Sequence, residues 1–371
     1  MFEPAIRKLL DQAHIAINGS EPWDIQVHDT RVYREVFLNK SLGLGETYMK
    51  GWWDCEKLDK MLTRILHANV HEEAGHNLTH KWHNIVSCMA NMQSKTRAPI
   101  VAEKHYNLDN DLFFRFLDPY RQYSCGYFAD TEDLAQAQRN KLNLICRKLE
   151  LQSNDHLLDI GSGWGGLAKY AAESYGCHVT GINISSSQRE SSETFCQDLP
   201  IRFEGCDYRD IRKTFSKIAS VGMFEHVGWK NYRTYFETAH RCLEPNGIFL
   251  LHTIGKNRTT KGKNDPWLDK YIFPNSAIPS ISQISKSLEG LFVVEDWHNI
   301  GPHYDKTLMA WYRNFLQAWP VLQERYDEQF KRMWSYYLLA CAATFRARQT
   351  QCWQIVLTKE STGRSQPARQ S

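Results

Sequence analysis

The sequence predicts an α/β protein in which a mostly parallel sheet carries helices on both faces and follows a smaller, mainly helical N-terminal domain. From Leu157 onward, short apolar segments alternate with helical patterns, as expected of βαβ units. The first apolar segment runs into a turn with four glycines within six residues, in His156-Leu-Leu-Asp-Ile-Gly-Ser-Gly-Trp-Gly-Gly-Leu-Ala168. Glycines at a strand-to-helix turn let the backbone pass close to a ligand. The sheet is therefore expected to be Rossmann-like, with its binding site at this turn.

The strands are predicted from short apolar or β-branched segments, and they cover residues 157–160, 178–182, 201–204, 218–221, 248–254, 292–295 and 353–358. Apolar residues at helical spacing predict an amphipathic helix over 132–149 and further helix over 308–348. The aromatic-rich stretch 255–283 separates the fifth and sixth strands. An insertion of this kind at the edge of a sheet is a candidate lid over a substrate.

The N-terminal part is predicted as a helix over 4–17, short strands within 24–37 and further helix over 58–92. Between them, the segment 41–54 contains Trp52 and Trp53. Two interpretations of this segment stay open: a surface that faces lipid or another domain, and a packed helical hairpin.

Polar residues and a proline interrupt the helical pattern near residues 91–100 and predict a domain boundary. The expected organisation is an N-terminal domain over 1–93 for lipid contact or dimerisation, a linker over 94–103, a catalytic domain over 104–358 and a disordered tail over 359–371.

Composition excludes several classes of function. The 371 residues have a net charge of +3, which gives no general case for nucleic-acid binding. The ten cysteines are scattered without a Cys-x-x-Cys pair, so neither a zinc site nor a disulfide framework is predicted. Reduced thiols are typical of the cytoplasm. The first residues lack a secretory signal, and no apolar run approaches the roughly 20 residues of a membrane span, so any membrane contact is expected to be peripheral.

The glycine spacing favours one cofactor class. Gly161-x-Gly163-x-Gly165 matches neither the dinucleotide pattern nor a phosphate-binding loop. Asp159 followed by this spacing resembles the first motif of S-adenosylmethionine-dependent methyltransferases. The backbones of Gly161 and Gly163 are expected to bind the amino-acid end of the cofactor.

Other candidate cofactor contacts follow the next strands. Asn183, Ser185 and Gln188 offer uncharged hydrogen-bonding groups after the second strand. Asp207, after the third strand, either binds the adenine amino group or caps a helix. Tyr208 is a candidate to stack on the adenine ring. Tyr106, Ser124 and Asp159 complete the predicted cofactor contacts.

A second set of reactive side chains is expected at the same edge of the sheet. Glu225 follows the fourth strand, and His252 lies at the end of the fifth. Cys125 and Tyr304 come from segments that can reach the same volume. Each has a structural explanation alone, but their joint placement indicates a catalytic site. No pattern predicts a metal.

The order of these motifs resembles the cyclopropane-fatty-acyl-phospholipid synthases, in the bacterial two-domain branch related to mycolic acid cyclopropane synthases. The resemblance extends from about Leu9 to Val356. It is carried by the glycine-rich turn and by Tyr123-Ser-Cys-Gly-Tyr127, Gly222-Met-Phe-Glu-His-Val-Gly228, Leu251-His-Thr-Ile-Gly255 and Lys270-Tyr-Ile-Phe-Pro274.

The resemblance implies methylene transfer from S-adenosylmethionine to a cis double bond of membrane phospholipid acyl chains, with bound bicarbonate as the base. It also implies a homodimer that acts in the cytoplasm, peripherally at the inner membrane surface. Two positions depart from the family: Ser162 stands where cysteine is usual, and Asn183 where threonine is usual. The implied bicarbonate ligands are the side chains of Cys125, Glu225, His252 and Tyr304 and the backbone of Ile254, with Cys341 nearby.

Three alternatives remain open at this stage. The same site without ring closure gives a methyl-branched or methylene acyl chain. A soluble small-molecule methyltransferase needs a base for an O–H or N–H group and a smaller lid. A lipid-surface binding protein without catalysis is the third. The cationic run 256–263 either contacts anionic headgroups or is a solvated loop.

Overall fold

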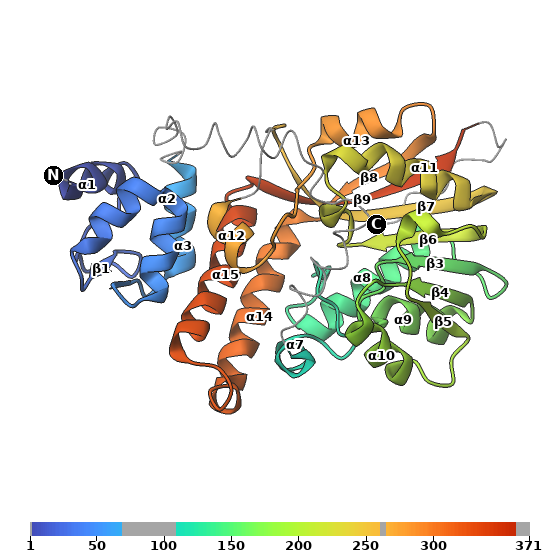
Figure 1. Ribbon diagram of the computed structural model, residues 1–371, viewed down its shortest axis with the longest axis horizontal. Coiled ribbons are helices and arrows are strands. Elements are labelled where there is room, and N and C mark those ends of the chain that lie inside the picture. Colours follow the sequence, from blue (N-terminus) through green and yellow to red (C-terminus); the bar gives the residue numbers. More distant parts are fainter. Residues whose placement is uncertain (1, 69–108, 260–264, 361–371) are drawn as a thin grey trace. The chain divides into compact units, whose positions relative to one another are not determined.

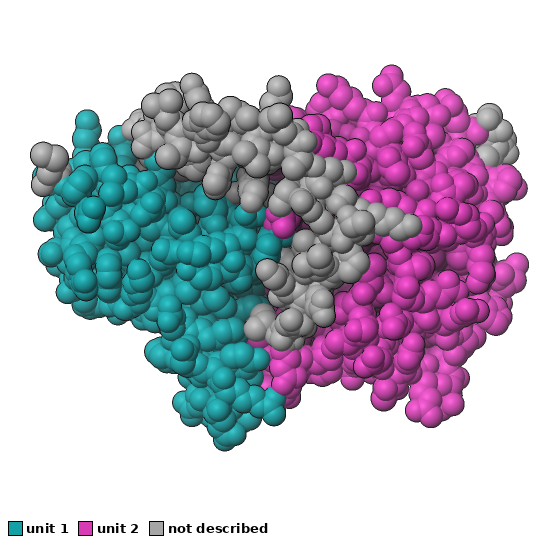
Figure 2. All heavy atoms as spheres, viewed as in Figure 1, with its two compact units in different colours: residues 1–90, 261–274, 304–350 teal, residues 91–260, 275–303, 351–371 magenta. Residues whose placement is uncertain are grey.

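The computed structural model describes residues 2–68, 109–259 and 265–360 (Figure 1). The chain forms two compact units (Figure 2): unit 1 comprises 1–90, 261–274 and 304–350, and unit 2 comprises 91–260, 275–303 and 351–371. Neither unit is a continuous stretch of chain. Segments 261–274 and 304–350, which were expected in the catalytic domain, belong to unit 1 with the N-terminal residues. The predicted linker 94–103, most of the predicted tail and residues 260–263 of the cationic run lie outside the described residues.

Unit 2 is built on one seven-stranded sheet in the order β5-β4-β3-β6-β7-β9-β8. The pairs β5–β4, β4–β3, β3–β6 and β6–β7 are parallel, and β8 is antiparallel to β9. All seven predicted strands are confirmed, several with longer ends. They are β3 (His156–Ile160), β4 (His178–Ile182), β5 (Ile201–Glu204), β6 (Phe215–Val221), β7 (Leu243–Lys256), β8 (Phe292–Asn299) and β9 (Thr350–Lys359).

The helices of unit 2 begin where the sequence supplies capping groups. The Asp133 carboxylate accepts from the Gln136 N–H at the start of α8, and Ser185 caps α10 in the same way. Ser280 and Gln283 form a reciprocal capping box at α13. The helices are α7 (Asn110–Phe116), α8 (Leu134–Lys148), α9 (Gly166–Tyr175), α10 (Ser186–Phe195), α11 (Tyr232–Cys242) and α13 (Ile281–Leu288), with short 3-10 turns η1 (Tyr208–Asp210), η2 (Phe224–His226) and η3 (Trp229–Asn231).

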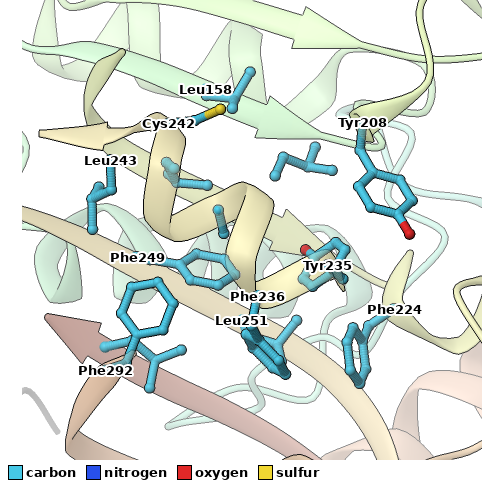
Figure 3. Close-up of a cluster of buried hydrophobic side chains, with 14 of the residues drawn as sticks. Leu158, Tyr208, Phe224, Tyr235, Phe236, Cys242, Leu243, Phe249, Leu251 and Phe292 are labelled. Carbon is cyan, nitrogen blue, oxygen red and sulfur yellow. The ribbon is translucent and has the colours of Figure 1, made fainter. Parts of the chain in front are cut away.

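Helices cover both faces of this sheet, as predicted. One face packs on α11 and α13 through a cluster rich in aromatic residues, including Phe236, Phe249 and Phe292 (Figure 3). The other face packs on α8 and α9 through smaller aliphatic residues. Side chains alternate between the faces along each strand, so Leu158 belongs to the first cluster and Leu157 to the second. The parallel strands thereby bring the loops after β3, β4, β6 and β7 to one edge.

Unit 1 is mainly helical, as predicted for the N-terminal part. The predicted helices over 4–17 and 308–348 are confirmed in outline, the latter as two helices with a break after Leu322. Its elements are α1 (Phe2–Gln12), β1 (Gln26–Val27), α2 (Arg31–Met49), β2 (Trp53–Asp54), α3 (Leu58–His67), α12 (Pro266–Tyr271), α14 (Gly301–Leu322, of which residues from 304 onward belong here) and α15 (Glu328–Arg346).

The structure corrects one expectation in this unit and decides between the two open interpretations of Trp53. Strand structure within 24–37 is limited to β1, because α2 begins at Arg31 just after Asp29, whose carboxylate accepts from the Arg31 backbone and guanidinium N–H groups. Trp53 is fully buried, and its Nε1–H donates to Leu44 O and Thr47 Oγ1, so Trp53 is a core residue of unit 1 and not a lipid-facing one.

The predicted lid segment has an ordered part within unit 1. Trp267 of α12 is buried and contacts the Tyr336 ring at a centroid distance of 4.7 Å. Glu46 of α2 accepts from Tyr271 Oη at 2.9 Å and pairs with Lys270. These contacts fix α12 on α2 and α15.

Candidate active site

The glycine-rich turn after β3 has a backbone that only glycine adopts readily. Gly161 has a φ of +85°, and a Cβ at this position would lie 2.7 Å from the Cβ of Met223. The N–H groups of Gly161 and Ser162 both donate to Ile182 O, at 3.0 and 3.1 Å. The turn is therefore held against the end of β4.

The uncharged residues predicted after β4 lie against this turn. Asn183 Nδ2 donates to Gly163 O at 3.1 Å and to Gln188 Oε1 at 2.9 Å. Asn183 Oδ1 accepts from the Ser185 N–H, which shapes the start of α10. The structure thus brings Gly161, Gly163, Asn183 and Gln188 together, as expected of a cofactor site.

Asp159 is a buried carboxyl at the end of β3. Burial raises its pKa to about 7, and the positive charge of Lys141 partly opposes this shift. Within the described part of the chain, Asp159 Oδ2 and the neighbouring Ser162 Oγ have no hydrogen-bond partner. Buried polar atoms are normally satisfied, so these two fit a polar ligand such as the amino-acid end of S-adenosylmethionine.

Asp207 forms a cap in this structure. Its Oδ1 accepts from the Arg209 N–H at 3.0 Å, and both carboxylate oxygens bind the Arg209 guanidinium at 2.7 and 2.8 Å. Tyr208 belongs to the aromatic cluster, is only 5% exposed and contacts the Tyr235 ring. Adenine binding by Asp207 and Tyr208 stays a prediction.

Of the remaining cofactor candidates, Tyr106 lies outside the described residues. Ser124 is buried; its Oγ accepts from Lys141 Nζ at 3.1 Å, and its carbonyl accepts from Gln138 Nε2 at 2.8 Å.

Glu225 lies in η2, just after β6, and is buried. Its Oε1 accepts from the Ile254 N–H at 2.6 Å, and its Oε2 has no partner among the described residues. Burial raises the pKa of this carboxyl, while the hydrogen bonds from Ile254 and Thr253 lower it to a smaller extent. The proton is thus retained to higher pH than on an exposed glutamate.

His252 is buried at the end of β7, beside β6. The Gly222 N–H donates to His252 O at 2.9 Å, which ties the segment before Glu225 to the histidine. Cys352 Sγ lies 3.3 Å from His252 Nε2, and Gln354 Nε2 lies 3.4 Å from His252 Nδ1. Residues of β9 therefore contact both ring nitrogens.

Cys125 joins the same cluster through Cys352. The Cys125 thiol is fully buried and donates to Gly126 O at 3.3 Å. Burial and a hydrogen bond with Cys125 raise the pKa of the Cys352 thiol well above its usual value. The structure thus places Cys125, Glu225, His252 and the Ile254 backbone near the carboxyl-terminal part of β7; their role as a bicarbonate site stays a prediction.

The other two predicted site residues belong to unit 1. Tyr304 is buried, and its ring contacts Phe345 and Trp311 at centroid distances of 4.5 and 6.0 Å. Cys341 lies in α15, where burial, together with the charge of Asp265, raises its thiol pKa to about 12. A shared site with the unit 2 cluster stays a prediction.

Sequence reasoning missed Cys352, Gln354, Gln138 and Lys141, all buried and polar or titratable. A signal existed for Gln354, because a glutamine inside an otherwise apolar strand needs a partner. The described residues contain no group of three His, Cys, Asp or Glu side chains that could hold a metal. Within that same part of the chain, no helix is long and apolar enough to cross a membrane.

The parallel sheet, the glycine-rich turn after β3 and the polar cluster after β6 and β7 define an S-adenosylmethionine-dependent methyltransferase. The family model described as mycolic acid cyclopropane synthetase matches residues 93–355. The chain belongs to this family, and the resemblance drawn from its motifs is confirmed.

Two relatives cover most of the chain. The cyclopropane-fatty-acyl-phospholipid synthase of Escherichia coli (strain K12) is 50% identical over 352 residues, which are 95% of this chain and 92% of that protein. The tuberculostearic acid methyltransferase UfaA1 of Mycobacterium tuberculosis is 32% identical over 88% of this chain and 81% of its own length.

Solved structures agree with the predicted fold. The cyclopropane synthase MmaA2 from Mycobacterium tuberculosis matches with a TM-score of 0.66 and 28% identity, over 70% of this chain and 98% of that one. The mycolic acid cyclopropane synthase CmaA1, complexed with SAH and CTAB, matches with the same TM-score and coverage at 30% identity.

Proposed function

We propose that this protein transfers a methylene group from S-adenosylmethionine to the cis double bond of unsaturated phospholipid acyl chains and so forms a cyclopropane ring. The observation that carries this proposal is the buried cluster of Cys125, Glu225 and His252 beside a methyltransferase cofactor turn. The 50% identity to a cyclopropane-fatty-acyl-phospholipid synthase over 95% of the chain supports the same substrate class.

The residues around the β3 turn fit S-adenosylmethionine. The unpartnered Asp159 Oδ2 and Ser162 Oγ would bind its amino-acid end, with the Gly161 and Gly163 backbones beneath and Asn183 and Gln188 alongside. When bound, this co-substrate supplies an electrophilic sulfonium methyl group. An alkene has no proton to remove before attack, so the turn contributes by holding the methyl donor in a fixed orientation.

The cluster after β6 and β7 fits bicarbonate as the base. Glu225 Oε2 is buried without a partner in the described structure, and burial raises the pKa of this carboxyl. In its protonated form it would donate a hydrogen bond to the anion. His252, Cys125 and the Ile254 backbone would be further contacts, and Tyr304 is proposed to join them. When bound, bicarbonate accepts the proton whose loss closes the ring.

Neighbouring residues orient the side chains of this site, and burial excludes water from it. The Ile254 N–H fixes Glu225 Oε1, and residues of β9 hold both nitrogens of His252. Burial of Cys125, Glu225 and His252 excludes water, which would otherwise trap a carbocation on the acyl chain as an alcohol.

Peripheral membrane contact on the cytoplasmic side and a homodimer are further parts of the proposal. Membrane contact is supported by the substrate class, because a phospholipid acyl chain must leave a bilayer to reach a buried site. The homodimer is supported by the family resemblance.

A product assay tests the proposed function. Purified protein is incubated with S-adenosylmethionine, bicarbonate and vesicles of unsaturated phospholipid, and the acyl chains are analysed by mass spectrometry and NMR. The expected product has gained one methylene unit and a cyclopropane signal and has lost the alkene. A methyl-branched product would favour a fatty-acid methyltransferase, as the name of the relative UfaA1 suggests. Unchanged acyl chains would contradict lipid alkylation.

A further inference from the structure

Helix α8 presents two buried polar side chains toward the active site. Gln138 and Lys141 are both 0% exposed. They are three residues apart and therefore lie on the same side of the helix. The rest of the buried face of α8 consists largely of apolar residues such as Leu142 and Ile145, which pack in the sheet core.

Both side chains bind one segment, residues 122–125, which contains the candidate site residues Ser124 and Cys125. Lys141 Nζ donates to Gln122 Oε1 and to Ser124 Oγ, the latter at 3.1 Å. Gln138 Nε2 donates to Ser124 O at 2.8 Å. Lys141 and Gln138 therefore hydrogen-bond to this segment and not to solvent.

The chain just before this segment is fixed by a second set of hydrogen bonds. The Asp118 carboxylate accepts from the N–H groups of Tyr120 and Gln122 at 2.7 and 2.8 Å. A Cβ on Gly166, the first residue of α9, would lie 1.8 Å from Tyr120 O. The segment therefore passes directly over the beginning of the helix that follows the glycine-rich turn.

Burying the Lys141 ammonium costs desolvation free energy, which suggests that the charge has a role. Burial lowers the pKa of Lys141 to about 8, and the nearby carboxyl groups of Asp118 and Asp159 partly oppose this shift. A methionine of similar length would fill the volume without that desolvation penalty. The acidic groups around Lys141 belong to both halves of the site, because Asp159 lies at the cofactor turn and the Cys125 thiol lies in the base cluster.

We propose that Lys141 is a positioning residue, which, together with Gln138, holds residues 122–125 so that Ser124 meets the cofactor and Cys125 meets the base cluster. This inference rests on the proposed function for the roles of Ser124 and Cys125. It predicts that loss of the Lys141 ammonium weakens cofactor binding and bicarbonate use together, although Lys141 itself touches neither.

The test compares Lys141→Met with Lys148→Met in the full-length protein. Lys148 lies on the same helix and is also buried, but its ammonium pairs with Asp296 at 3.0 Å and lies 3.1 Å from His298 Nδ1. Both variants remove one buried ammonium, so a purely structural role predicts similar consequences for the two. The readouts are the Kd of S-adenosylhomocysteine by calorimetry, the bicarbonate concentration for half-maximal activity, and Tm.

Lys141→Met is expected to raise the Kd of S-adenosylhomocysteine and the half-maximal bicarbonate concentration by about tenfold or more, whereas Lys148→Met changes each less than twofold. Equal values in the two variants would overturn the proposal. Calorimetry does not depend on turnover, so a wild-type protein that makes no cyclopropane would contradict the proposed function while leaving this cofactor readout intact.

A double-mutant cycle covers the case in which Lys141→Met does not fold. Lys141→Gln, Ser124→Ala and the double variant are compared for S-adenosylhomocysteine affinity. A positioning role that acts through Ser124 predicts that the double variant loses clearly less than the product of the two single losses. Multiplicative losses would show that Lys141 does not act through Ser124 and would overturn the proposal.

Discussion

The two faces of the unit 2 sheet are both well buried, yet they differ in chemistry. The face under α11 and α13 is filled by aromatic and aliphatic side chains (Figure 3). The face under α8 also carries polar groups near the carboxyl ends of the strands, including Lys141, Asp159, His252 and Gln354. Burying a polar group without full pairing is unfavourable. The comparison indicates that one face mainly provides stability, whereas the other carries, at one end, the groups proposed to take part in the reaction.

The largest expected effect tests the reactive face. Glu225→Gln keeps the shape of the side chain but removes a titratable carboxyl, and turnover is expected to fall by about 10²–10⁴-fold. S-adenosylhomocysteine affinity and Tm should stay close to the wild-type values, because Glu225 is proposed to act at the base and not at the cofactor. Near wild-type turnover in this variant would contradict the bicarbonate assignment.

The second prediction concerns the apolar face. Phe236→Ala removes a fully buried ring from the aromatic cluster and is expected to destabilise the protein by about 3–5 kcal/mol. Turnover per folded molecule should be nearly unchanged, as measured below the unfolding transition with the folded fraction determined by circular dichroism. A variant that kept its stability but lost turnover would break the division between the faces.

Asp159→Asn separates stability from cofactor binding. The folded-state pKa of Asp159, about 7, lies above its ordinary value of 3.8, so the folded protein binds the extra proton between these pH values and loses stability as pH rises through them. The variant lacks this loss. The difference in unfolding free energy between the variant and the wild type is therefore expected to shift in favour of the variant, by on the order of 3 kcal/mol, between pH 4 and pH 7. Denaturant titrations at several pH values measure this, and a pH-independent difference would contradict the shift. S-adenosylhomocysteine affinity should fall.

The smallest effect is expected from Gln354→Leu. This change is similar in size and removes the amide beside His252 Nδ1, so the imidazole loses a group that fixes its orientation. Turnover is expected to fall by about tenfold. The matched comparison is Gln351→Leu, at a glutamine of the same strand that pairs with Asn299 instead. If both variants retain equal activity, Gln354 has no part in orienting His252.

Much of this fold follows from local patterns in the sequence. The seven strands were predictable because their short apolar segments pack on both faces of one sheet, and the glycine-rich turn marked its ligand-binding edge. The helix that begins after Asp29 was not predictable, because the short alternation of apolar and polar residues there fits either a strand or the buried side of a helix. The sequence left the position of Trp53 open, because its partners Leu44 and Thr47 come from the preceding helix.

The site was predictable only in part, and the reason is its dependence on strand order. Glu225 follows β6, and His252 lies in β7, which pairs with β6, so their proximity follows from a parallel sheet. Cys352 and Gln354 reach His252 because β9 lies next to β7, an arrangement that chain order does not reveal. Lys141 was hidden because a lysine in an amphipathic helix is normally exposed.

The most direct test uses S-adenosylmethionine with a trideuterated methyl group and vesicles of unsaturated phospholipid. Methyl transfer followed by loss of one deuteron from the transferred CD3 group to the base leaves two deuterium atoms on the bridging carbon. The expected product is therefore a dideuterated cyclopropane, identified by mass spectrometry and NMR. A methyl-branched product that retains all three deuterium atoms would contradict ring closure through deprotonation at the Glu225 and His252 cluster.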